Sequence, residues 1–112
     1  MTLQELITKL NLTVITTPRD FNTITPQGGY ASDLLSCVVA GAQPGNLWIT
    51  LQAHMNVVAV AALKEVSAVI ITENAQPDAD VIGKANNQGV VLLSTSEPSY
   101  QVVGKLWEMG IR

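Results

Sequence analysis

The sequence predicts an α/β fold: a single three-layer domain in which a mostly parallel sheet of four to five short strands is flanked by helices. Short apolar segments alternate along the chain with helical patterns, which is typical of parallel sheets with right-handed crossovers. Two of these segments, 68–72 and 90–94, lack polar alternation and are expected to be buried on both faces. The 112 residues, 47% of them apolar, fit one domain over residues 1–112.

The N-terminal third begins with a predicted helix over residues 2–11. Thr2 and Glu5 have the spacing of a capping box, and the apolar residues of the segment fall on one helical face. A β-branched strand is expected over 12–16. The polar segment 17–29 is punctuated by prolines and ends in a glycine pair, which indicates a loop.

The middle of the chain is predicted to hold a helix over 33–40, a strand over 47–51 and a helix over 56–65. Ser32 or Asp33 is expected to cap the first of these helices, because short polar side chains accept hydrogen bonds from free helical N–H groups. Gly41 is expected to end it.

The C-terminal part repeats the alternation. Strand 68–72 leads to a helix opened by Pro77 and Asp78 and stopped by Gly89. Strand 90–94 leads to a last helix through about Met109, with Ser96 as its expected cap.

The helical segment 57–65 is apolar on every side until Lys64. A helix that is apolar all round is normally buried, and a small chain has little material to cover it. The segment is therefore predicted to form the interface of a homodimer. Crowding by neighbouring helices is the alternative, since the alanines of the segment allow close approach.

Composition excludes several functional classes. The net charge is −3 and the six basic residues are scattered, which argues against a nucleic-acid partner. No apolar run is long enough to span a membrane, and the N-terminus does not resemble a signal peptide. The lone cysteine forms no internal disulfide, so a cytoplasmic location is expected.

No catalytic or metal-binding set can be assembled from the sequence. His54, the only histidine, is expected in a loop before a helix, without a nucleophile or an orienting carboxylate. Cys37 has apolar neighbours and is expected to be a buried, inert side chain. Phosphate-loop and dinucleotide-binding motifs are absent from the sequence, so no enzyme activity, cofactor or metal is predicted.

Polar residues follow four predicted strands, and the carboxyl ends of parallel strands form the ligand crevice of such sheets. Free amides of helix N-termini favour an anion there. The predicted ligand-binding residues are Gly28, Gly29, Tyr30, Ser32, Asp33, His54, Asn56, Thr72 and Ser94, with Asn74 and Thr95 on the same rim. Helix caps supply similar residues at such places, so a purely structural role stays open.

The glycine pair is part of this prediction. Gly28 and Gly29 are expected to adopt positive φ, to reverse the chain and to aim the amides of residues 30–33 at the rim. An anionic group of the ligand would then lie at the start of the following helix.

Four blocks of the sequence carry a family resemblance: QGGYASDLLS, GNLWITLQAHMNVVAVAALKEVSAVIIT, PDADVIGKANNQGVVLLST and VGKLWEMGIR. In order and spacing they resemble the DRTGG domain family from about Thr2 to Arg112. The chain departs from the family signature, because TPQ precedes the glycine pair in place of Asp-Arg-Thr. Cys37 stands where relatives would be expected to have an acidic residue.

The resemblance implies a small α/β domain like the N-terminal domain of HPr kinase/phosphorylase. Similar domains accompany phosphotransacetylases and regulatory pyrophosphatases, where they look regulatory or dimer-forming. Together with the polar rim, the resemblance predicts a non-catalytic, homodimeric module that recognises a small anionic ligand or nucleotide and modulates a partner protein. The alternative is a ligand-free dimerisation or interaction scaffold for a metabolic or redox system associated with hydrogenases.

Overall fold

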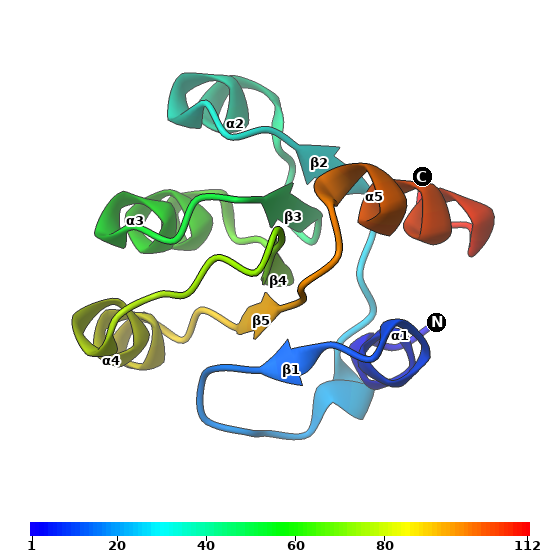
Figure 1. Cartoon of the computed structure of the whole chain (residues 1–112), viewed down its shortest axis with the longest axis horizontal. Coiled ribbons are helices and arrows are strands. Elements are labelled where there is room, and N and C mark those ends of the chain that lie inside the picture. Colours follow the sequence, from blue (N-terminus) through cyan, green and yellow to red (C-terminus); the bar gives the residue numbers. More distant parts are fainter.

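A five-stranded sheet lies between two layers of helices in the computed structural model, which describes residues 1–112 (Figure 1). The strands are β1 (Thr13–Val14), β2 (Gly29–Ala31), β3 (Leu47–Thr50), β4 (Ala68–Ile71) and β5 (Leu92–Ser94). Their order is β1-β5-β4-β3-β2, and only β1 runs antiparallel to its neighbour. The predicted α/β class and the mostly parallel sheet are confirmed.

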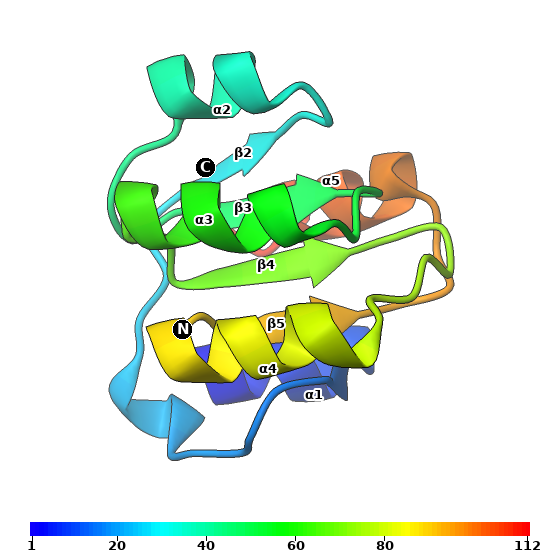
Figure 2. The same ribbon diagram turned by 90° about the vertical axis from the view of Figure 1, so that its left-hand side faces the viewer.

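Helices cover both faces of the sheet (Figure 2). The first layer holds α2 (Leu35–Gly41), α3 (Met55–Lys64) and α4 (Ala79–Gln88), and the second holds α1 (Leu3–Leu10) and α5 (Ser99–Glu108). A 3-10 turn, η1 (Phe21–Thr23), lies near α1 in the long loop before β2. None of these helices has the length and apolar character that crossing a membrane requires.

Alternation of side chains along the central strands builds two cores. Trp48, Val69 and Leu92 pack under α2, α3 and α4, while Ile70 and Leu93 pack under α1 and α5. Every residue of β3, β4 and β5 is buried. This confirms that segments 68–72 and 90–94 are buried on both faces, and it extends the same status to β3.

Helix starts follow the predictions in part. Thr2 forms the predicted capping box of α1, and Asp78 caps α4 by accepting a hydrogen bond from the Val81 N–H. The predicted caps of the other two helices are wrong, because α2 begins after Leu34 and α5 begins after Pro98, each without a side-chain cap. The strand expected over 12–16 has only two paired residues, since β1 pairs only with the short β5.

The glycine pair lies at the amino end of β2, away from the predicted rim. Gly28 has φ +72°, as predicted, but Gly29 does not have positive φ, so that half of the prediction is wrong. A Cβ on Gly28 would lie 3.1 Å from the Arg112 carbonyl oxygen. Gly28 therefore allows the start of β2 to lie close to the C-terminus. It does not contribute to the carboxyl edge of the sheet, where the ligand site was predicted.

Helix α3 lies between α2 and α4 (Figure 2). Val58 is fully buried on its sheet-facing side, whereas Leu63 is 67% exposed on the other. Both ideas about this helix thus describe part of it: neighbours crowd its flanks, and an apolar residue remains on its outer side. Cys37 on α2 is exposed, so the prediction of a buried thiol is wrong.

Candidate functional site

The carboxyl ends of β2, β3, β4 and β5 meet at one edge of the sheet, as the parallel topology requires. This edge divides into two parts of different character. Over β2 and β3 the polar side chains bond to one another and to the backbone. Over β4 and β5 they line an open cleft.

Asp33 organises the part over β2 and β3. Its Oδ1 accepts hydrogen bonds from the Thr50 hydroxyl and from the Leu51 N–H, both at 2.8 Å. The neighbouring Ser32 hydroxyl accepts from the Leu34 N–H at 3.1 Å, which makes a turn before α2. These bonds tie the exit of β2 to the exit of β3. We call this arrangement, centred on Ser32, Asp33, Thr50 and Leu51, the β2–β3 lock.

The remaining predicted residues near the lock are either exposed to solvent or already hydrogen-bonded within the chain. His54 and Asn56 are exposed at the start of α3, and His54 makes no capping bond. Thr72 is fully buried, and its hydroxyl lies 3.3 Å from the Thr50 carbonyl oxygen and 2.5 Å from the Ser99 hydroxyl. Thr72 thus joins β4 to β3 and to α5.

A cleft of about 610 Å³ opens over β4 and β5 and extends to the end of α1. We call it the polar cleft, because Leu10 is the only apolar residue among the eleven that line it. Its polar lining consists of Lys9, Asn11, Thr13, Asn74, Gln76, Ser94, Thr95, Ser96, Glu97 and Lys105. The volume falls within the range of small-molecule sites.

Some charged and polar groups of the polar cleft are paired within the chain, and others are not. The Lys105 ammonium pairs with Glu97 Oε1 at 2.5 Å, whereas Glu97 Oε2 is buried and has no hydrogen-bond partner. Lys9 forms no ion pair. Ser94 is only 6% exposed, and its hydroxyl makes no hydrogen bond within the chain. The cleft therefore has a formal charge of +1 and free polar groups of both kinds.

The loop between β4 and α4 forms one wall of the cleft. Glu73 and Asn74 both adopt left-handed backbone conformations, with φ +60° and +59°. Their N–H groups donate to the carbonyl oxygens of Glu97 and Thr95, and the Glu73 carboxylate accepts from the Ser99 N–H at the start of α5. These bonds hold the exits of β4 and β5 together and offset the cost of that backbone conformation.

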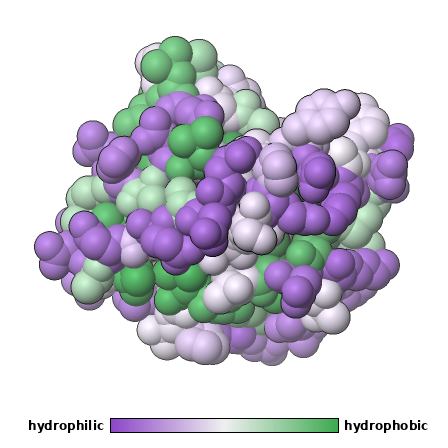
Figure 3. All heavy atoms as spheres, viewed as in Figure 1, coloured by the Kyte–Doolittle hydropathy of each residue, from purple (hydrophilic) through white to green (hydrophobic).

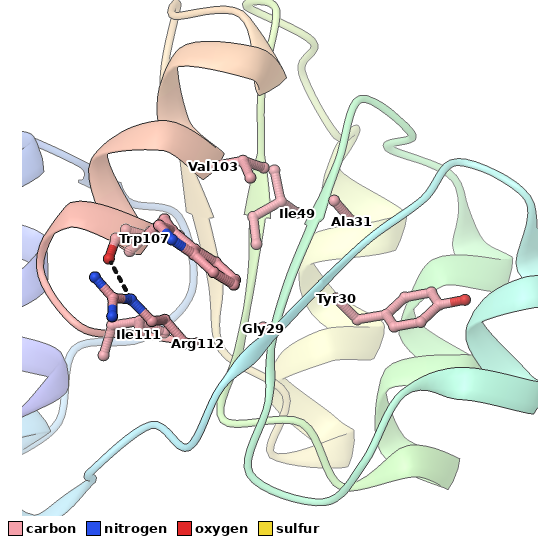
Figure 4. Close-up of a pocket in the computed structure, with 9 residues that line it drawn as sticks. Gly29, Tyr30, Ala31, Ile49, Val103, Trp107, Ile111 and Arg112 are labelled. Carbon is pink, nitrogen blue, oxygen red and sulfur yellow. Dashed lines mark hydrogen bonds between the residues drawn. The ribbon is translucent and has the colours of Figure 1, made fainter.

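A second, apolar depression lies between edge strand β2 and the end of α5 (Figure 4). This apolar groove, of about 120 Å³, is lined by Gly29, Tyr30, Ala31, Ile49, Val103, Leu106, Trp107, Ile111 and Arg112. The Arg112 guanidinium lies 5.3 Å from the Trp107 ring centre, and its Nε donates to the Trp107 carbonyl oxygen. The ring of Tyr30 points away from the groove (Figure 4) and packs on Gly41, where a Cβ would lie 2.5 Å from it.

Of the nine predicted ligand-binding residues, the structure brings only Ser94 into the polar cleft. Asn74 and Thr95, placed on the same rim by the sequence, also line it. Lys9, Glu97 and Lys105 were missed. Their signal was weak, because a lysine in the last turn of a helix or on its polar face normally indicates only a solvated position. No group of three or more metal-ligating side chains lies together in the structure.

The family model of the DRTGG domain matches residues 35–109, which is 75 of the 112 residues. The chain belongs to the DRTGG domain family. This confirms the resemblance predicted from the sequence. The match begins at Leu35, so the glycine pair and the segment before it lie outside the matched region. No curated protein matches the sequence.

A similar fold occurs in a solved structure. This is the crystal structure of the CBS and DRTGG domains of the regulatory region of Clostridium perfringens pyrophosphatase, complexed with activator, diadenosine tetraphosphate. The TM-score is 0.76 at 14% sequence identity, over 92% of this chain and 44% of that one. This likeness shows the fold, and this chain spans less than half the length of the solved chain.

Proposed function

We propose that this chain is a non-catalytic regulatory module that binds a small anionic ligand or a nucleotide and modulates a partner protein. The polar cleft is the observation that carries the proposal, because it joins a pocket of ligand size to an unpaired ammonium group on Lys9. Membership of the DRTGG family supports it, as does the occurrence of the same fold in a regulatory region complexed with a nucleotide activator.

The absence of catalysis is part of the proposal. Covalent catalysis needs a nucleophile within hydrogen-bond reach of a base. Ser94 is the most buried hydroxyl of the cleft, but neither His54 nor Cys37 lines the cleft with it. The lining is suited to binding and holds no nucleophile–base pair. We propose the cytoplasm as the location, since the single cysteine is free and exposed.

The homodimer is also proposed, with an interface that includes α3. Leu63 on the outer side of α3 is 67% exposed. On the neighbouring α2, Leu34 at the N-cap position is 61% exposed and Val39 within the helix is 42% exposed. Apolar side chains gather over α2 at the top of the face in Figure 3. A surface of this kind is buried favourably when two copies associate.

Ligand binding is tested by thermal denaturation with a panel of anions and nucleotides at high concentration. A ligand at about 100 times its dissociation constant adds about 2.7 kcal/mol of stability, which raises the melting temperature by about 10 °C in a domain of this size. The increase should disappear in Lys9→Gln and persist in Lys84→Gln, which changes an exposed lysine on α4 outside the cleft. A panel without any shift would contradict ligand binding.

The dimer is tested by sedimentation of the native chain, Leu63→Glu and the control Asn87→Glu, which changes an exposed polar residue of α4. The native chain and the control should sediment as dimers at micromolar concentration. Leu63→Glu should be monomeric, because a buried unpaired charge opposes association. A native monomer would refute the dimer.

One observation favours the alternative of a ligand-free interaction scaffold. Trp107 at the apolar groove is 58% exposed and Tyr100, on the same helix, is 89% exposed. Exposed aromatic residues beside a groove are common in protein interfaces. The scaffold reading would be supported by partner binding that is lost in Trp107→Ala and unaffected in Lys9→Gln.

A further inference from the structure

We propose that the ligand of the polar cleft is a small hydroxylated anion, such as a sugar phosphate, rather than a bare inorganic anion or a nucleotide. This inference rests on the proposed function and narrows its ligand class. Three groups of the cleft carry it: the unpaired ammonium of Lys9, the buried oxygen of Glu97 and the unpartnered hydroxyl of Ser94.

Lys9 attracts the anionic end of the ligand. It lies in the last turn of α1 without an acidic partner, on the side of the cleft formed by α1 and β1. Next to it, Asn11 ends the helix in a left-handed conformation and adds an amide side chain to the same wall. An ammonium group and an amide together can donate to the oxygens of one phosphate or carboxylate group.

Glu97 sets a second requirement. One carboxylate oxygen is paired with Lys105, and the other is buried without a donor. An unsatisfied buried acceptor is costly, and an ionised carboxylate can only accept hydrogen bonds. A ligand hydroxyl can reach this oxygen once the carboxylate turns about its terminal torsion, which is broad and roughly two-fold, whereas a phosphate placed there is repelled. The ligand therefore needs a hydroxyl-bearing part separate from its charged part.

Ser94 is a third contact built into the cleft. The residue is 94% buried at the end of β5, and its free hydroxyl can donate to or accept from a ligand. It is held by strand pairing on both sides, to Thr13 of β1 and to Ile71 of β4. A hydroxyl fixed in this way is preorganised for a polar ligand atom.

The lining does not suit a nucleobase. Bases are bound by stacking on aromatic or other apolar side chains. In the polar cleft Leu10 is the single apolar residue, and none of the five aromatic residues of the chain lines it. A sugar ring presents hydroxyl groups around its edge and fits this polar lining better than a flat heteroaromatic base.

The class is tested by isothermal titration with four probes: ribose 5-phosphate, ribose, inorganic phosphate and ATP. Ribose 5-phosphate should bind most tightly. Lys9→Gln should weaken it about tenfold, the value of one charge-assisted hydrogen bond, and the control Lys84→Gln should leave it unchanged. Melting curves of the unliganded variants verify folding, and Lys9→Gln changes an exposed side chain, so a loss of affinity in this variant reports on the site and not on the fold.

Glu97→Met separates the two parts of the ligand, because methionine keeps the length of the side chain but accepts no strong hydrogen bond. The change should weaken ribose 5-phosphate several-fold and strengthen inorganic phosphate, since the hydroxyl contact is lost and the repulsion is removed. The other outcomes would contradict the proposal in different ways. If ribose 5-phosphate and inorganic phosphate bind the native chain equally, and both bind Glu97→Met more tightly, the cleft is a simple anion site and the ligand class is wrong. If ATP binds most tightly and its binding depends on Lys9, the ligand is a nucleotide. The proposed function then holds and only the sugar-phosphate class fails. If no probe binds, ligand binding at this cleft itself fails.

Discussion

The β2–β3 lock and the polar cleft occupy neighbouring parts of one sheet edge, yet their polar residues have opposite roles. In the lock, one Asp33 oxygen accepts two hydrogen bonds, from the Thr50 hydroxyl on β3 and from the N–H of the next residue, Leu51. In the cleft, the Ser94 hydroxyl makes no hydrogen bond within the chain, and Glu97 Oε2 is buried without a donor. Satisfied polar groups stabilise a connection between strands, and unsatisfied ones remain available to a ligand. The type of polar residue at a strand exit therefore does not distinguish a structural lock from a binding cleft. The hydrogen bonds that the residue makes within the chain do distinguish them.

Removing the carboxylate of the lock is expected to have the largest effect on stability. Asp33→Ala leaves the Thr50 hydroxyl and the Leu51 N–H without their acceptor and should cost about 3 kcal/mol, from two partly exposed charge-assisted bonds. Asp33→Asn keeps an oxygen at the same place and should cost about half as much. Urea denaturation measures both. The comparison would break if Asp33→Ala lost ligand affinity at unchanged stability.

The glycine pair should behave as part of the fold. Gly28→Ala is expected to cost about 2 kcal/mol, because alanine resists positive φ and its Cβ would approach the Arg112 carbonyl oxygen. Gly89→Ala, at nearly the same φ but with open space around the Cβ, should cost about 1 kcal/mol. The difference between the two free energies of unfolding measures the close approach. Equal costs would show that the contact with Arg112 is unimportant.

Thr72 lies between the two regions and should belong to the lock. Thr72→Val keeps the shape of the side chain and removes the hydroxyl shared with Ser99, so a loss of about 1 kcal/mol is expected. The affinity for ribose 5-phosphate should stay within a factor of two, because Thr72 does not line the cleft. A larger loss of affinity would extend the site toward the centre of the sheet.

His54 should show the smallest effect. The side chain is exposed and makes no capping bond, so His54→Ala should change the free energy of unfolding by less than about 0.5 kcal/mol. Ligand affinity should be unaffected as well. A tenfold loss of affinity would restore His54 to the binding site, and the ligand would then have to extend across the lock.

The sequence by itself determined the features that depend on neighbours along the chain. The alternation of apolar segments with helices predicted the sheet, and the spacing of Thr2 and Glu5 predicted the first helix start. Burial of segments 68–72 and 90–94 followed from their lack of polar alternation. These properties are local, because side-chain periodicity and short-range capping bonds set them.

Tertiary structure decided which polar residues are free. Asp33 reaches β3 instead of capping α2, a choice that depends on the position of a strand 17 residues away. The antiparallel pairing of β1 with β5 brings the end of α1, and Lys9 with it, beside Ser94. The local sequence pattern predicts neither the contact of Asp33 with β3 nor the position of Lys9 beside Ser94. A short polar side chain can bond to its own turn or to a neighbouring strand. The polar cleft therefore exists only because the fold places the end of α1 beside the exits of β4 and β5.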